Sequence, residues 1–313
     1  MNSHRQITYM TSITIMLILA CIADVMWGGH ANMDIMLHLR LPRMVTALLA
    51  GAAMALSGSQ MQSIFRNPLA DPHIMGISSG AALGAAITTM YAGVALGGAP
   101  IAISAAIGAG AAAAVILYAS RKFSNASVLL IFGVMLGFIV TAAVTVLQFS
   151  SDAESLKTYY SWSAGSFSNS GWNEIGILAA TLAAGLILTA RNTKGLDIIL
   201  FGDEFATMAG APVHRIRLVS IISCCLITAA VTAFCGPIGF VGIVAPHIAR
   251  GIFKTSSHRV ILPASLLTGG ITALAADLLS RTTSSPVPIA STMAIVGVPV
   301  IIYILLKGRR YGE

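Results

Sequence analysis

Long apolar runs separated by short polar links dominate this chain from its first residues to its last. A helix needs about 20 mostly apolar residues to cross a membrane, and ten runs approach that length. We place them at about residues 7–27, 42–65, 74–94, 99–119, 126–149, 173–190, 216–236, 238–253, 261–280 and 288–306. The eighth run is short and holds Pro246 and His247. The pattern predicts an all-α, polytopic membrane protein with one transmembrane domain over residues 1–313.

Composition agrees with this pattern. Hydrophobic residues make up 56% of the chain and charged residues only 9%, whereas soluble domains carry about 25% charged residues. The four cysteines lie inside apolar runs without a Cys-x-x-Cys pair, so we interpret them as small buried hydrophobes. The first run lacks a small-residue cleavage site at its end, which favours a retained helix over a removed signal.

The basic residues set the orientation. With ten spans and a cytoplasmic N-terminus, 14 of the 18 Lys and Arg fall in inner links. The outer links keep only Arg40, Arg43, Lys157 and Arg281. By the positive-inside rule this predicts cytoplasmic N- and C-termini, and it explains the net charge of +7 without nucleic acid. The outward arginines either bind carboxylates or reach lipid headgroups.

Several kinds of chemistry lack their sequence signatures. No phosphate-binding loop, zinc motif or cluster of carboxylates occurs, so we expect neither catalysis nor a bound metal. Ion-coupled carriers keep acids inside the membrane, and here the only candidates are Asp24 and Asp277, both near the outer ends of their spans. We therefore interpret the chain as a translocation body that receives its energy from elsewhere.

The longest inner link covers residues 191–217 and contains "ILFGDEFATMAGAP" at 199–212. Asp203 and Glu204 could cap and open a short helix, which Gly210 and Pro212 would end. Such a helix is either a simple connection or a docking element, and spacing alone does not separate the two.

"LRLPRMVTALLAGAAMALSGSQMQSIFRNPLADPHIMGISSGAALGAA" at 39–86 closely resembles the signature of the FecCD/BtuC family of ABC importer permeases. Further similar blocks follow in order: "FGDEFATMAGAP" (201–212), "GPIGFVGIVAPHIARGIF" (236–253), "HRVILPAS" (258–265), "AADLLSR" (275–281) and "GVPVIIYILLK" (297–307). The chain departs from the family at 282–297, where the family more often has an acidic residue and a Leu-Pro-x-Gly turn.

The resemblance implies an assembly in the cytoplasmic membrane. It contains two permease copies, two separate ATPase subunits that bind ATP and Mg²⁺, and one extracytoplasmic substrate-binding protein; this chain binds no cofactor. Arg40, Arg43 and Arg281 are then expected to dock glutamates of the binding protein. The inner link becomes an ATPase-coupling loop, and the coupling residues are Leu200, Gly202, Asp203, Glu204, Phe205, Ala206, Met208 and Gly210.

The resemblance also assigns a cytoplasmic gate to Asn67, Pro68, Leu69 and Asn125. The residues are compatible with this role, because Pro68 and Pro72 prevent a continuous helix and the Asn67 and Asp71 side chains can accept hydrogen bonds from freed amides. The alternative is a mere turn.

We therefore expect a permease, not an enzyme, that imports a metal chelate, with a ferric siderophore favoured over cobalamin or haem. An ion-coupled carrier and a structural scaffold are the alternatives from other classes.

Overall fold

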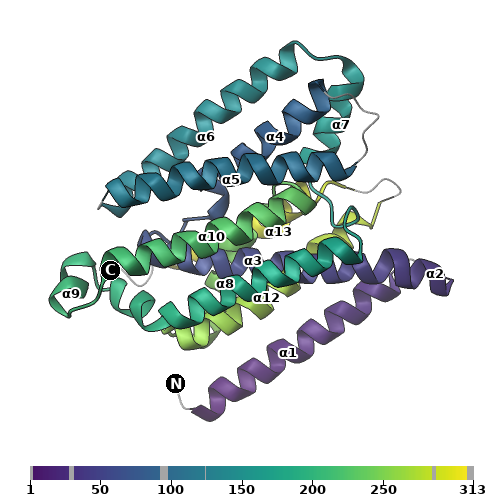
Figure 1. The fold of residues 1–313 in the computed structure, drawn as a ribbon. Helices are drawn as coiled ribbons and strands as arrows, with labels where there is room; N and C mark the ends of the chain where they lie inside the picture. The colour runs from purple at the N-terminus through teal and green to yellow at the C-terminus, as the bar shows by residue number, and fades with distance from the viewer. Residues whose placement is uncertain (1–2, 28–31, 92–97, 124, 284–286, 309–313) are drawn as a thin grey trace.

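The computed structural model describes residues 3–27, 32–91, 98–123, 125–283 and 287–308, and within these ranges every regular element is helical. The long helices lie side by side, roughly parallel or antiparallel to one another (Figure 1). They are α1 (Ser3–Met26), α3 (Leu41–Ile64), α4 (Ile77–Tyr91), α5 (Gly98–Lys122), α6 (Ala126–Phe149), α8 (Trp172–Ile199), α10 (Val213–Cys235), α11 (Val241–Phe253), α12 (His258–Ser280) and α13 (Ile289–Gly308).

Short elements mark the two ends of the bundle. The left-hand end in Figure 1 carries α9 (Asp203–Met208) and the first residues of α1; we call it the α9 end. The opposite end carries α2 (Met33–Ile35) and α7 (Ala153–Ser163), and we call it the α7 end. A π-helical turn, η1 (Met36–Arg40), leads from α2 into α3, and a 3-10 turn, η2 (Pro72–Met75), precedes α4.

The ten long helices correspond one to one to the ten predicted runs, so the predicted all-α, multi-span fold is confirmed. Within the described residues, seven helices are long and apolar enough to cross a membrane, while α4, α11 and α13 are shorter or less apolar. The main boundary difference is α8, which continues to Ile199 instead of ending near 190. The polar stretch 191–199 resembled a loop, yet a helix that projects beyond the bilayer needs no apolar surface there.

Helix α3 is the centre of the bundle, because 18 of its 24 residues are buried. Small residues let its neighbours approach closely. Gly51 lies against Gly269 of α12, and Gly58 lies against the backbone of Gly242 in α11. Lipid supplies no hydrophobic drive between helices, so close backbone packing of this kind is what holds membrane helices together.

Polar side chains of α3 add hydrogen bonds to each neighbour. Ser59 Oγ donates to Ser265 Oγ of α12 at 3.0 Å, and Gln60 Nε2 donates to Ser223 Oγ of α10 at 3.2 Å. These groups are fully buried. Each bond therefore satisfies groups that would otherwise be costly in an apolar interior.

Gln62 repairs the defect that Pro246 creates in α11. A proline has no N–H and leaves the carbonyl four residues earlier without its helical donor, which here is that of Gly242. The Nε2 atom of Gln62 donates to this carbonyl at 3.1 Å, and the Oε1 atom accepts from Arg250. The short eighth run is thus a helix, and Gln62 of α3 supplies the hydrogen bond that Pro246 cannot make. His247 has a structural contact, since its Nδ1 atom lies 2.8 Å from the Ile243 carbonyl oxygen.

The packing at Gly58 makes a direct prediction. A Cβ atom at this position would lie 1.9 Å from the Gly242 carbonyl oxygen, whereas one at Gly110 of α5 would meet nothing within 4 Å. Gly58→Ala should lower the free energy of unfolding by about 1–3 kcal/mol through overpacking. Gly110→Ala, the control, should be neutral or stabilising by up to about 1 kcal/mol. Unfolding of the purified protein in detergent measures both; equal stability of the two variants would contradict the packing.

Candidate functional site

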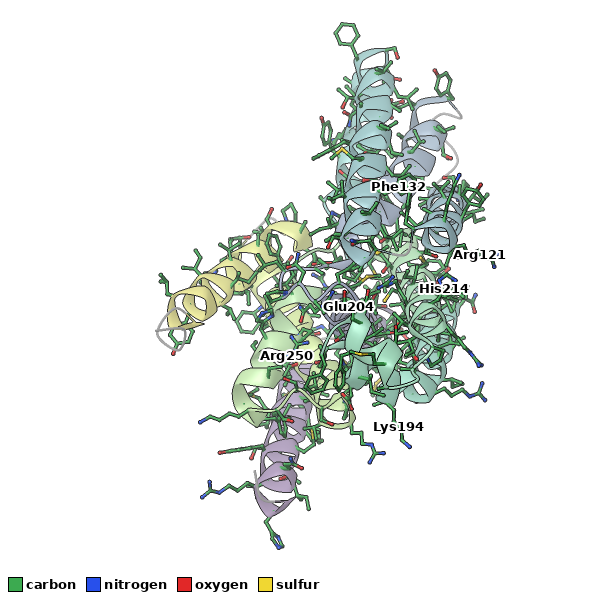
Figure 2. The ribbon with its side chains drawn as sticks, turned by 90° about the vertical axis from the view of Figure 1, so that its left-hand side faces the viewer. Arg121, Phe132, Lys194, Glu204, His214 and Arg250 are labelled. Carbon is green, nitrogen blue, oxygen red and sulfur yellow. The ribbon has the colours of Figure 1, made fainter. Side chains whose placement is uncertain are left out.

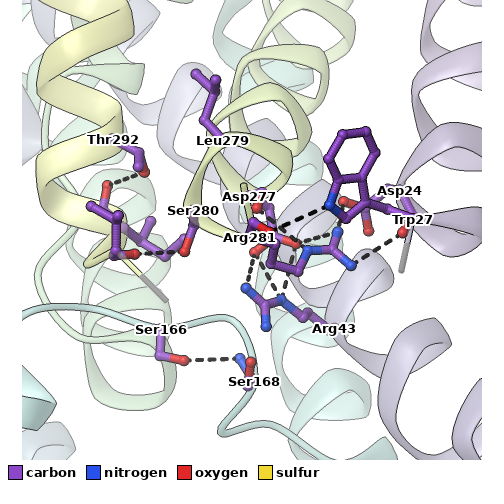
Figure 3. Close-up of polar contacts among 12 residues, drawn as sticks. Asp24, Trp27, Arg43, Ser166, Ser168, Asp277, Leu279, Ser280, Arg281 and Thr292 are labelled. Atoms are coloured by element: carbon purple, nitrogen blue, oxygen red, sulfur yellow. Dashed lines mark hydrogen bonds and ion pairs between the residues drawn. The ribbon is translucent and has the colours of Figure 1, made fainter. Parts of the chain in front are cut away.

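Two arginines and two aspartates form one network at the α7 end (Figure 3). The Arg43 guanidinium of α3 binds Asp277 of α12, with Nη2 to Oδ1 at 2.8 Å and Nε to Oδ2 at 3.0 Å. Arg281 Nη2 lies 2.8 Å from Asp277 Oδ2 and also pairs with Asp24 of α1. The two aspartates are buried and the arginine side chains are only 17% and 15% exposed. The four charges offset one another.

Arg40 lies beside this network and contacts the backbone of α1. Its Nη1 atom donates to the carbonyl oxygen of Val25 in α1 at 3.1 Å, and Arg281 Nη1 donates to the carbonyl oxygen of Asp24 at 3.2 Å. Of the three arginines predicted to dock a binding protein, Arg40 and Arg281 thus contact the end of α1, and Arg43 joins them through Asp277. Headgroup snorkelling does not fit Arg43 and Arg281, because both bind buried aspartates.

The pairing of Asp24 and Asp277 with these arginines was not predicted from the sequence. Both were expected to lie inside spans near the outer ends, without a connection to Arg43 or Arg281. A usable signal existed, because acids within a membrane are rare and usually pair with a nearby cation. Their engagement with arginine also argues against their use as proton sites of a carrier.

One side of helix α9 packs against the ends of α8 and α10. Ala206 is fully buried in a small cluster with Ile199 and Ile216. Asp203 Oδ2 accepts from Arg217 Nη2 of α10 at 2.7 Å. The expected cap is therefore corrected: Gly202 is the N-cap, and Asp203 is the first helical residue with its carboxylate held by Arg217.

The other side of α9 presents apolar side chains outward. Phe201, Phe205 and Met208 are 74%, 50% and 81% exposed, and the two rings lie 5.5 Å apart. Figure 2 looks onto this end of the bundle and shows Glu204 at the same face. Leu200 is the C-cap of α8. A cluster of exposed apolar side chains on a link outside the spans is typical of an interaction site.

A glycine with a positive φ angle stands at each end of α9. Gly202 has φ of 109° and Gly210 has φ of 77°, a region that side chains on Cβ disfavour. Gly210 ends the helix as the sequence indicated, and the space around it is open. Its requirement for glycine is therefore conformational.

The predicted gate residues adopt the local structure expected of them. Asn67 Oδ1 accepts from the N–H of Leu69 at 2.9 Å, and Asn125 Oδ1 accepts from the N–H of Ser127 at 2.8 Å, as the N-cap of α6. Leu69 and Pro68 are exposed. Their approach to the same residues of a second copy stays a prediction.

Asp71 anchors the loop after these residues. Its Oδ1 atom accepts from the N–H of His73 at 2.9 Å, and its carboxylate also accepts from the N–H of Phe240, in the irregular stretch between α10 and α11. Burial raises the pKa of Asp71, and these two hydrogen bonds partly oppose the rise. One side chain thus fixes two irregular segments.

Arg66 lies between the predicted gate residues and the start of α9. It follows α3, precedes Asn67 and has φ of 47°. Its guanidinium lies over Gly202, where a Cβ atom would come within 3.2 Å of Nη1. No local pattern predicts this contact, because the two segments are more than 130 residues apart.

The structure also brings together a serine, a histidine and an aspartate. His258 Nε2 lies 2.6 Å from Ser63 Oγ, and His258 Nδ1 lies 2.6 Å from Asp197 Oδ1. Ser63 is fully buried, and its hydroxyl donates to the carbonyl oxygen of Ser59. No substrate can reach this hydroxyl, so the three residues tie α3, α8 and α12 together.

Comparisons with known proteins identify the family of this chain. Residues 7–307 match the FecCD transport family. The chain belongs to the FecCD transport family. This FecCD chain is 31% identical to the vitamin B12 import system permease protein BtuC of Citrobacter koseri, over 99% of this chain and 97% of that protein. It is 34% identical to the hemin transport system permease protein HmuU of Yersinia pestis, over 91% and 85%.

A solved structure gives the same result. The FecCD chain matches a metal-chelate-type ABC transporter in an inward-facing conformation with a TM-score of 0.87 and 26% identity, over 96% of this chain and 99% of that one. The chain is therefore a multi-pass permease of an ABC importer in the inner membrane, and the expected family is confirmed.

The network around Asp277 makes a second prediction. Asp277→Ala leaves Arg43 and Arg281 with Asp24 alone and should lower the free energy of unfolding by about 3 kcal/mol. Adding Arg43→Met should recover part of this loss, because Arg281 and Asp24 then balance. Lys157→Ala, which removes an exposed cation of α7, should change stability by about 0.5 kcal/mol at most. Titration of the purified protein with sodium dodecyl sulfate measures all three; additive losses in the double variant would rule out one coupled network.

Proposed function

We propose that this FecCD permease imports a metal chelate, with a ferric siderophore as the favoured cargo. The observation that carries the proposal is the likeness, over nearly the whole chain, to a metal-chelate-type ABC transporter. Relatives named for vitamin B12 and hemin support the same cargo class, since both are macrocycles that hold a metal. Cobalamin or haem is the second candidate on the same observation.

We propose the following assembly. Two copies of the chain stand side by side with both termini in the cytoplasm, two ATPase subunits lie below and one substrate-binding protein lies above. The apolar side chains that α9 exposes support an ATPase contact, because Phe201, Phe205 and Met208 gain most when covered. ATP and Mg²⁺ belong to that partner.

Docking of the binding protein by Arg40, Arg43 and Arg281 is part of the proposal. Their common position at the α7 end supports it. Because Asp24 and Asp277 already hold Arg43 and Arg281, carboxylates of the binding protein would meet preoriented arginines of reduced charge. Such contacts contribute more to register and association rate than to affinity.

The contact of Arg66 with Gly202 supports a direct route from the ATPase to the gate. A displacement of α9 acts on the Arg66 guanidinium, and Arg66 is joined by one peptide bond to Asn67 of the proposed gate. In this proposal, a movement at the ATPase contact reaches the gate through a single residue, Arg66.

The cargo is tested by growth of a strain that lacks this permease. We expect failure on single ferric siderophores as the limiting iron source, with rescue by the intact chain. Failure confined to haem or cobalamin would transfer the assignment to that cargo. Uptake in vesicles that needs an ion gradient but no ATP would contradict an ABC importer altogether.

Coupling is tested at Gly210. Gly210→Val forces a β-branched residue to φ of 77°, which costs about 1–2 kcal/mol, or roughly a five- to thirtyfold loss of the docked conformation. ATPase retention on purification and ATP-driven uptake should fall together while membrane insertion persists. Gly251→Val in α11, where a Cβ atom meets open space, is the control. Unchanged ATPase retention and uptake in Gly210→Val would show that α9 does not couple.

A further inference from the structure

A groove opens between α8 and α12 at the α9 end of the bundle, with a volume of about 630 Å³. Leu56 of α3, which is fully buried, lines its floor. Helices α8 and α12 both pack far more extensively on α3 than on each other. They therefore separate above α3, and the groove lies in this separation.

Three cations line the mouth of this groove. Arg191 and Lys194 come from the last turns of α8, and Arg259 comes from the first turn of α12. All three are exposed, and Figure 2 shows Lys194 reaching out from the α9 end of the bundle. The start of α12 adds the positive end of its helix dipole at the same place.

The deeper part of the groove is apolar. Leu186 lies eight residues before Lys194 on α8, and Leu266 lies seven residues after Arg259 on α12, with Leu262 between them. At 1.5 Å per residue, both leucines lie about 10–12 Å from the cations of their own helix. On both helices, which run antiparallel, the side chains that line the groove change from cationic at its mouth to apolar in its interior.

Asp197, in the last turn of α8, does not cancel these cations. Asp197 accepts from the N–H of His258 at 2.8 Å and lies 2.6 Å from His258 Nδ1. Its carboxylate is thus directed at the first residue of α12. One acid among three cations leaves the mouth with a positive balance.

We propose that this groove binds an anionic phospholipid of the adjacent leaflet. The headgroup phosphate binds Arg191, Lys194 and Arg259, and one acyl chain lies along Leu186, Leu262 and Leu266. Basic pockets between membrane helices bind anionic headgroups in this way. A soluble anion would leave the apolar half in water, and a neutral lipid would leave three cations without a counter-charge. The site does not depend on the cargo, and only the choice of the cytoplasmic leaflet rests on the orientation proposed above.

Native mass spectrometry of the purified importer complex tests the site, with dioleoylphosphatidylglycerol and dioleoylphosphatidylcholine as probes. The intact protein should retain phosphatidylglycerol in preference. Arg191→Gln, Lys194→Gln and Arg259→Gln together should remove this preference, with a loss of roughly fivefold in affinity per cation. Leu266→Trp fills the groove, so it should lower phosphatidylglycerol retention while the cations remain.

The control removes three exposed cations outside the groove, through Arg5→Gln, Arg121→Gln and Lys122→Gln, and should keep the preference. Equal retention of both lipids by the intact protein would overturn the proposal, as would an equal loss in the control. If the groove variant keeps the lipid preference but loses the ATPase subunit on purification, the three cations serve that partner instead.

Discussion

Burial of α3 inside protein is the constraint on which the rest of the structure depends. A membrane helix that faces lipid can stay apolar, whereas α3 carries serines, glutamines and glycines along its length and is covered by α8, α10, α11 and α12. Those residues would be unfavourable in lipid. Ser59, Gln60 and Gln62 meet matching groups on α12, α10 and α11, so α3 fixes the relative depth of these neighbours as well as their packing.

The functional elements lie at the two ends of this central helix. At one end, Arg43 ties α3 to α12 through Asp277, and Arg281 of the same network ties α12 to α1 through Asp24. At the other, Arg66 reaches the start of α9, next to the proposed gate residues. One helix, α3, thus contacts the structural elements at both ends of the bundle. The irregular stretch between α10 and α11 is anchored beside this helix through Asp71.

Much of this arrangement could be predicted from the sequence, because span length and apolar content are local properties. The ten runs, the short helix before Gly210 and the Asn67 turn all followed from neighbouring residues. The pairing of Asp24 with Arg281 and of Arg66 with α9 did not, since those partners are distant in the chain and no periodicity connects them. The extent of α8 was missed for a different reason: hydrophobicity reports where the bilayer ends, and this helix continues beyond it. Gly202, and not Asp203, is the N-cap of α9, because the Asp203 carboxylate pairs with Arg217.

The contacts of α3 also set an order of events during synthesis. Its polar partners Ser223, Gly242 and Ser265 lie 163 to 206 residues further along the chain. When α3 leaves the ribosome, none of them exists yet. The helix must therefore wait at the insertion machinery, or in lipid with its serines and glutamines unsatisfied, until α12 has been translated. The centre of the permease is thus among the first segments made and among the last to reach its native environment.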